Sequence, residues 1–275
     1  MRGYLQLIRP LNCVMATIGC LLGSFVALGS VVAFSTTAAL QAAAIALLFT
    51  AAGNSLNDYY DRDVDRVNHP ERPIPSGRVS PRGALLTAAI LFAPTLPWSF
   101  FVRQELLIVV LINLILMSSY ELVFKKGGFR GNLLIGWLVA SLFIFGGLAV
   151  YDSSEALQRA FILAVLAFLA TLGREVVKDI QDVTGDADRR TLPMTLGRRG
   201  AGVVASVSLL LGVALSMLPV AIGLLGTYYL YLVLVADAMF IYAAFNSARR
   251  PTSSQRAAKY AMAVALAAFL VGGFP

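Results

Sequence analysis

Four aspartates lie within eight positions of the chain, between two long apolar segments: Asp58, Asp61, Asp63 and Asp65. If this stretch is helical, Asn57, Asp61 and Asp65 fall within an arc of about 80°. Asp58 then lies at the edge of that stripe, and Asp63 points roughly the opposite way. Three oxygen ligands on one helix face suit a hard divalent cation such as Mg²⁺. The alternative is a solvated acidic loop that joins two apolar segments.

A second acidic stretch also follows a long apolar segment. Asp179, Asp182 and Asp186 are spaced so that a continuous helix brings them within an arc of about 60°. If Gly185 ends the helix, Asp186 approaches the site from a loop instead, because glycine tolerates positive φ. Two acidic clusters that face a shared cavity repel each other unless cations lie between them. The second stretch therefore strengthens the prediction of a metal site.

Basic residues accompany both acidic stretches. The first stretch contains Arg62, Arg66, Arg72 and Arg78, and the second contains Lys178, Arg189 and Arg190. Carboxylates that hold a metal, together with arginines, form a receptor for a diphosphate group. The pattern therefore predicts a diphosphate-binding site made from two distant parts of the chain.

The composition indicates which kind of protein carries these stretches. Of the 275 residues, 58% are hydrophobic and only 13% are charged, whereas a soluble domain has about a quarter charged residues. A membrane-spanning helix needs about 20 apolar residues, so the chain has room for about eight to ten. The sequence therefore predicts an all-α polytopic membrane protein. The net charge of +7 does not indicate nucleic acid, because the basic residues gather in loops on one side of the membrane.

The apolar segments predict about nine transmembrane helices around a central cavity that opens to the cytoplasmic side. We expect them at residues 11–34, 38–57, 81–102, 104–124, 131–150, 156–177, 200–224, 227–246 and 257–273. With nine helices, both acidic stretches lie on one side, together with all of the 22 lysines and arginines except Arg103 and Arg159. The positive-inside rule makes that side cytoplasmic. The predicted location is the cell membrane, with the active site facing the cytoplasm.

The chain is predicted to form one transmembrane domain over residues 1–275. Each acidic stretch follows an even-numbered helix, and each is followed by a basic loop that contains proline. This plan suggests a duplicated unit, at residues 1–130 and 131–246, with a ninth helix at 257–273.

The chain resembles the UbiA superfamily of intramembrane prenyltransferases. The resemblance rests on two motifs, Asn57-Asp58-x-x-Asp61-x-x-x-Asp65 and Asp179-x-x-Asp182-x-x-x-Asp186, and covers essentially the whole chain. Within the superfamily, the wording at residues 57–61, 72–78 and 173–179 is similar to the archaeal digeranylgeranylglyceryl phosphate synthase family. Many quinone-pathway relatives have a tyrosine where this chain has Arg174, which favours a lipid acceptor over an aromatic one.

The resemblance implies transfer of a geranylgeranyl group from its diphosphate to geranylgeranylglyceryl phosphate, with two Mg²⁺ ions as cofactor. The partners it implies are a prenyl diphosphate, a lipid-like acceptor from the bilayer and the membrane lipids themselves. It assigns metal binding to Asn57, Asp58, Asp61, Asp65, Asp179, Asp182 and Asp186. It assigns diphosphate binding to Arg66, Lys125, Lys126 and Lys178, and acceptor binding to Arg9, Asn12 and Arg72. Catalysis would depend on Asp61, Asp65, Asp182 and Asp186.

Two other functions remain open at this point. One is a prenyltransferase that acts on an aromatic quinone precursor. The other is a cation-coupled transporter, which Asp237 favours because the prediction places it at membrane depth. The acidic stretches disfavour transport, since they lie at one membrane face and not at the midplane. Asp237 has a simpler interpretation, a hydrogen bond to a neighbouring helix.

Overall fold

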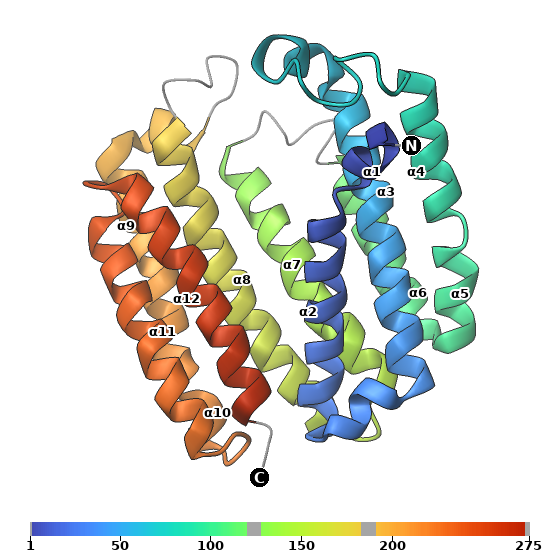
Figure 1. Ribbon diagram of the computed structural model, residues 1–275. Coiled ribbons are helices and arrows are strands. Elements are labelled where there is room, and N and C mark those ends of the chain that lie inside the picture. Colours follow the sequence, from blue (N-terminus) through green and yellow to red (C-terminus); the bar gives the residue numbers. More distant parts are fainter. Residues whose placement is uncertain (1, 120–127, 183–190, 273–275) are drawn as a thin grey trace.

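The computed structural model describes residues 2–119, 128–182 and 191–272, and all regular structure in these ranges is helical (Figure 1). In chain order the helices are α1 (Arg2–Ile8), α2 (Pro10–Leu28), the 3₁₀ helix η1 (Val31–Ser35), α3 (Thr37–Asn68), α4 (Pro81–Phe92), α5 (Thr95–Val102), α6 (Gln104–Ser119), α7 (Phe129–Val150), α8 (Ser154–Asp182), α9 (Leu192–Ser216), α10 (Leu218–Ala221), α11 (Thr227–Asn246) and α12 (Pro251–Gly272).

Seven segments in the described part of the chain are long and apolar enough to cross a membrane. Three of these segments consist of consecutive helices: α1 with α2, α4 with α5, and α9 with α10. The shorter apolar helix α6 and the 22-residue helix α12 are added to these seven segments. The described residues then contain nine main helical segments, which confirms the predicted count. The predicted all-α membrane architecture is likewise confirmed. The duplication of a four-helix unit stays a prediction.

Several predicted helix ends were wrong. The first predicted helix, 11–34, stops at Leu28, because Gly29 adopts a left-handed conformation (φ 61°) that closes the helix. The second, 38–57, continues to Asn68, and the residue before Pro70 leaves the helical region (φ −141°). The sixth, 156–177, continues to Asp182. The residues from Asn57 to Asp65 and from Asp179 to Asp182 therefore lie on extensions of apolar helices and not in loops.

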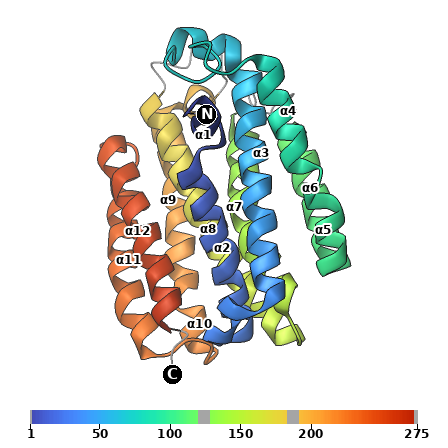
Figure 2. The ribbon, with the colours of Figure 1, turned by 45° about the vertical axis from the view of Figure 1, so that its right-hand side comes forward.

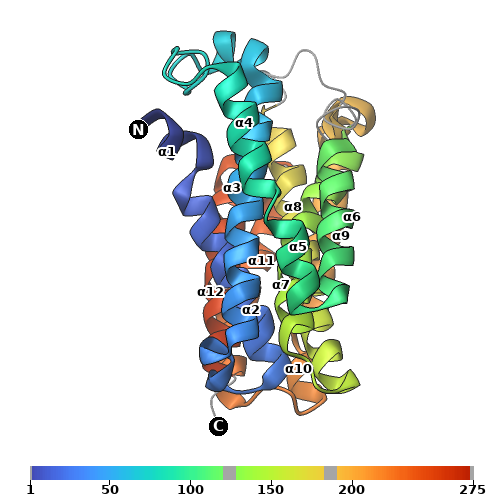
Figure 3. The same cartoon turned by 90° about the vertical axis from the view of Figure 1, so that its right-hand side faces the viewer.

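The helices form one elongated bundle (Figures 1 and 2). α2, α7 and α8 occupy its middle, with α9, α11 and α12 on one side and α3 to α6 on the other (Figure 1). The acidic ends of α3 and α8 lie at the same end of the bundle as the N-terminus, and the side view in Figure 3 shows the same arrangement. The opposite end holds η1, α10 and the start of α11.

Helices α2 and α7 cross at very short range. A Cβ atom on Gly23 would lie 2.1 Å from the carbonyl oxygen of Phe143, and one on Gly146 would lie 1.8 Å from that of Cys20. The Ser24 hydroxyl donates a hydrogen bond to the Gly146 carbonyl at 2.8 Å. Small residues at such a crossing let two backbones approach where lipid provides no hydrophobic drive for association.

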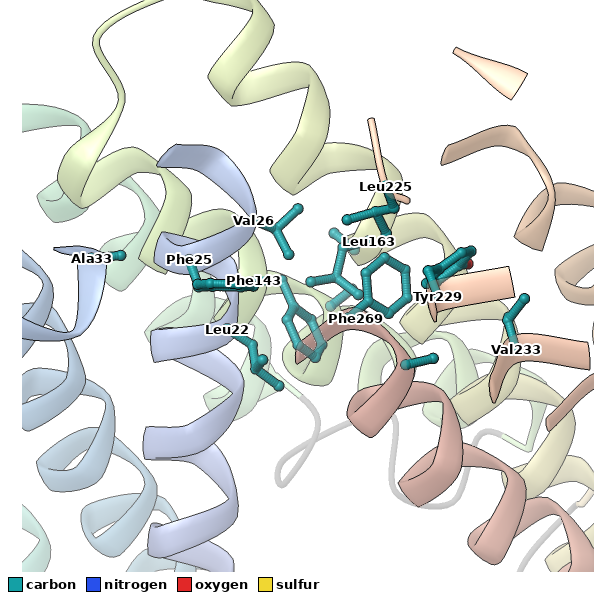
Figure 4. Packing of buried hydrophobic residues seen from close by; sticks show 13 residues of the cluster. Leu22, Phe25, Val26, Ala33, Phe143, Leu163, Leu225, Tyr229, Val233 and Phe269 are labelled. Carbon is teal, nitrogen blue, oxygen red and sulfur yellow. The ribbon is translucent and has the colours of Figure 1, made fainter. Parts of the chain in front are cut away.

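The crossing lies beside the largest buried cluster among the described residues. Figure 4 shows Phe25 and Phe143 from the middle of the bundle facing Tyr229 and Phe269 from α11 and α12. The rings of Tyr229 and Phe269 meet edge to face, with centroids 5.1 Å apart. This cluster joins the middle helices to α11 and α12 at the end away from the acidic helices.

Substitution of Gly146 by alanine is expected to destabilise the protein, because the new Cβ would overlap the backbone of α2. Overpacking of this kind costs about 1–3 kcal/mol. The Tm of the detergent-purified variant should therefore fall below that of the wild type. Gly212→Ala in α9 is the matched control, since its Cβ would meet only Leu169, at 3.8 Å. Equal Tm values for the two variants would contradict this account of the crossing.

Candidate active site

A cavity of about 590 Å³ lies inside the bundle and is bordered by residues of α2, α3, α6, α7, α8, α9, α11 and α12. Polar side chains line its end next to the acidic helices: Arg9, Asn12, Asn54, Asn57 and Arg174. Farther in, most of the wall is apolar, and Phe143, Tyr229 and Phe269 line it beside the buried cluster of Figure 4. The cavity therefore has one polar end and a long apolar interior.

The first acidic stretch occupies the last turns of α3. Asn57 lines the cavity, and Asp61, one turn farther along the same face, is half-buried. Asp58 and Asp65 are each only 3% exposed, whereas the side chain of Asp63 is 65% exposed. The helix thus separates one exposed carboxylate from those that face protein.

Arg9 connects the N-terminus to this stretch. It is the only non-glycine residue with positive φ in the described part of the chain (φ 50°), and it separates α1 from α2. The Asn54 side chain donates to the carbonyl of Ile8 at 2.9 Å, which holds this bend against α3. The Arg9 guanidinium then donates to Asp58 at 2.5 Å and to Asn57 at 3.5 Å, beside the cavity.

The loop at residues 69–80 folds back onto the end of α3. Nη1 of Arg72 donates to both carboxylate oxygens of Asp65, at 2.8 and 2.7 Å. Ile74 and Val79 of the loop bury against Leu7 of α1. The Arg72 side chain, predicted to bind the acceptor, is thus engaged in an ion pair with a predicted metal ligand.

The second acidic stretch ends α8, across the cavity from α3. Arg174 lines the cavity and forms an ion pair with the nearly buried Glu175. The carboxylate of Asp179 accepts a hydrogen bond of 2.8 Å from the buried Asn132 side chain at the start of α7. Asp182 and Lys178 are exposed. Both acidic helices therefore border the same end of one cavity.

The remaining predicted site residues fall into three groups. Asn12 lines the cavity. Arg66 is exposed and pairs with Asp63 at 3.4 Å, so in this conformation it points away from the cavity. The predicted residues Lys125, Lys126 and Asp186 lie outside the described residues. In the part of the chain that the structure describes, no three acidic, histidine or cysteine side chains form a compact metal cluster.

Sequence reasoning missed two polar residues at this end of the cavity, and it used a third, Arg174, only to choose between acceptors. Asn54 positions the N-terminal bend, Asn132 holds Asp179, and Arg174 lines the cavity from α8. A usable signal existed for each of them, because each is a polar residue within one or two turns of an acidic motif or at the end of an apolar segment.

Asp237, in the apolar part of the cavity, has a partner on the next helix. The Ser216 hydroxyl of α9 donates to its carboxylate at 2.7 Å, and the Tyr229 hydroxyl donates to the carbonyl of Ser216 at 2.8 Å. This hydrogen-bonded group agrees with the simpler interpretation of Asp237. It gives no support to a path of carboxylates through the membrane.

Comparison with known proteins places this geometry among membrane prenyltransferases. Residues 16–270 match the UbiA prenyltransferase family. The chain is similar to digeranylgeranylglyceryl phosphate synthases from Natronomonas pharaonis, with 38% identity over 98% of this chain and 96% of the relative, and from Methanothrix thermoacetophila, with 40% identity over 98% of each.

Solved structures have the same fold. A structure of digeranylgeranylglyceryl phosphate synthase has a TM-score of 0.84 and 33% identity, and covers 99% of this chain and 98% of that one. A UbiA homologue from Archaeoglobus fulgidus bound to GPP and Mg²⁺ has a TM-score of 0.59 and 17% identity over 96% of this chain and 99% of that one. At that identity the likeness concerns the fold alone.

The Arg72→Gln substitution is expected to loosen the loop at residues 69–80, because it leaves the buried Asp65 without its cation. Loss of a hydrogen bond to a charged group costs about 1.5–3 kcal/mol. We expect a lower Tm and faster proteolytic cleavage in this loop. Arg66→Gln, which breaks an exposed pair, is the control and should cost less than about 1 kcal/mol. Equal effects in the two variants would show that the Arg72–Asp65 pair does not hold the loop.

Proposed function

The chain belongs to the UbiA prenyltransferase family and is a prenyltransferase, and we propose that it transfers a geranylgeranyl group from geranylgeranyl diphosphate to geranylgeranylglyceryl phosphate. The product would carry a second ether bond, and diphosphate would be released. The observation that carries the proposal is a cavity with a polar end between two acidic helices and an apolar interior. The names of the relatives that match nearly the whole chain support the choice of acceptor.

The two ends of a prenyl diphosphate match the two parts of the cavity. Its tail is hydrophobic and fits the apolar walls formed by α7, α8, α11 and α12. Its head is strongly anionic and requires cationic partners at the polar end, where Arg9 and Arg174 are present. We propose Lys125, Lys126 and Lys178 as further partners of the diphosphate. We leave Arg66 out, because it lies on the side of α3 opposite Asn57.

The donor set of the acidic helices fits a hard divalent cation, since it consists of carboxylate and amide oxygens next to an anion site. We propose that Mg²⁺ is held by Asn57 and Asp61 of α3 and by Asp182 and Asp186 of the second motif. Asp58, Asp65 and Asp179 complete the proposed set of metal ligands. Asp58 and Asp65 would bind the metal once Arg9 and Arg72 leave their ion pairs with them and bind phosphate groups instead. When bound, the metal supplies Lewis-acid activation of the leaving diphosphate.

The residues of the chain then have separate tasks in the reaction. Arg9, Arg174 and the lysines take up the negative charge that grows on the diphosphate as the C–O bond breaks. The apolar walls keep water away from the allylic carbon, which becomes cationic. Phe49 lines the cavity about two turns from Asn57 and is the proposed aromatic partner of that cation. The acceptor oxygen forms the new C–O bond, and its proton passes to the released diphosphate.

The distribution of charge supports a cytoplasmic site. Arg103 and Arg159 lie at the end of the bundle opposite the acidic helices, while the other described lysines and arginines belong to the acidic end. Basic residues concentrate on the cytoplasmic side of membrane proteins. We therefore propose that the polar end of the cavity faces the cytoplasm.

Alanine at Asp61 or at Asp182 is expected to lower turnover by at least about 10³-fold, because each substitution removes an anionic oxygen ligand from the proposed metal site. Removal of divalent cations from the wild type should have the same effect, and added Mg²⁺ should restore activity. Asp63→Ala is the matched control, since this aspartate of the same motif is exposed and pairs with Arg62 and Arg66. The measurement is diphosphate release by folded, detergent-purified protein. Near-normal activity of either site variant would refute the metal assignment.

The acceptor is tested with purified protein, geranylgeranyl diphosphate and one acceptor at a time. We expect an ether product with geranylgeranylglyceryl phosphate and none with a hydroxylated aromatic quinone precursor. Product with the aromatic acceptor alone would replace the proposed acceptor and keep prenyl transfer. If folded protein with Mg²⁺ releases no diphosphate with either acceptor, then the proposed prenyl transfer is wrong for both acceptors.

A further inference from the structure

A second pocket lies at the opposite end of the bundle from the acidic helices. Its volume is about 740 Å³, and it is bordered by the end of α2, the start of α8, the connection between α10 and α11, and the end of α12. Four glycines leave parts of its walls without side chains: Gly29, Gly223, Gly226 and Gly272. Phe25 and Leu225, which appear in Figure 4, belong both to the wall of this pocket and to the large buried cluster.

Arg159 is the cation of this pocket. It projects from the first turns of α8, and its Nε is buried without a hydrogen-bond partner among the described residues. Its Nη1 lies beside Gly29, where a Cβ would come within 2.8 Å. A guanidinium presents five N–H donors in a planar fork that matches phosphate oxygens, and a buried donor without a partner is costly. The arginine is therefore positioned to receive an anion.

The other walls of the pocket also suit an anion. Helix α11 begins in the pocket, and its N-cap, Gly226, has no side chain to accept from the first free N–H groups. The positive end of a 20-residue helix therefore faces the same space as Arg159. Thr227, Tyr228 and Tyr231, which carry hydroxyl groups, also line the pocket.

The position of the pocket indicates where its ligand comes from. Tyr228 and Tyr231 are 59% and 64% exposed at the start of a membrane-spanning helix. Exposed tyrosines at such a place are typical of the level of lipid headgroups. A pocket with an arginine at that level can take a phosphate group while the acyl or isoprenoid chains of the same molecule remain in the bilayer.

We propose that this pocket binds the phosphate group of a membrane lipid, taken from the leaflet opposite the proposed active site. Arg159 and the first turn of α11 hold the phosphate oxygens. The site is separate from the cavity between the acidic helices, and it does not depend on the substrates proposed above.

The proposal is tested by lipid binding to the full-length protein in native mass spectrometry. Phosphatidylglycerol is compared with diacylglycerol of the same acyl chains, which lacks the phosphate. Wild type should retain one phosphatidylglycerol molecule that Arg159→Gln binds about tenfold more weakly. The retention of diacylglycerol should be the same in wild type and in every variant. Arg103→Gln is the matched control. It removes the same charge at the same end, but Arg103 already stacks on Tyr151 at 4.1 Å.

Arg159→Lys provides a second variant that keeps the positive charge, in case the glutamine variant does not fold. Because lysine lacks the planar fork, its retention of phosphatidylglycerol should fall between wild type and Arg159→Gln. Equal phosphatidylglycerol binding by wild type and a folded Arg159 variant would overturn the proposal. Displacement of the lipid from wild type by low millimolar inorganic phosphate would also overturn it, because the pocket would then be a site for the free ion.

Discussion

Carboxylates at the end of an apolar bundle need partners, because an uncompensated charge buried there is costly. In this protein each partner comes from a different segment. Arg9 from the N-terminus pairs with Asp58, Arg72 from the following loop pairs with Asp65, and Asn132 of α7 donates to Asp179. These contacts fix α1, the loop at residues 69–80 and the start of α7 around one end of the cavity. The acidic residues thus organise the same end of the fold at which we propose that they act.

The length of α3 determines where these carboxylates lie. The helix has 32 residues and is therefore about 48 Å long, whereas the hydrocarbon core of a bilayer is about 30 Å thick. Its last turns must project beyond the hydrocarbon. The acidic residues are therefore held at the edge of the hydrocarbon by a rigid helix that is anchored among apolar neighbours. A flexible loop of the same composition would leave their spacing undefined.

The sequence was sufficient for the helix count, because that count depends on local composition. It also contains the two acidic motifs as local spacings, whose role in the site stays a prediction. It was insufficient for helix ends and for partners. Hydropathy falls at Asn57, but the backbone hydrogen bonds of α3 continue to the turn before Pro70, so the predicted end was too early. The bend at Arg9 and the Asn132–Asp179 contact depend on residues far apart in the chain. Nothing in local spacing specifies them.

Under the proposed function, a cavity with one polar end also restricts how two substrates can lie in it. Donor and acceptor each have an anionic head and a long apolar tail, so both heads must lie near Arg9 and Arg174 and both tails among the apolar walls. The reacting allylic carbon is next to the diphosphate, and the reacting hydroxyl is close to the phosphate of the acceptor. Alignment of the two heads therefore brings the reacting atoms to the same depth. Proximity of this kind supplies a large part of the rate enhancement of a bimolecular reaction, and a small aromatic acceptor without a tail would not be aligned in this way.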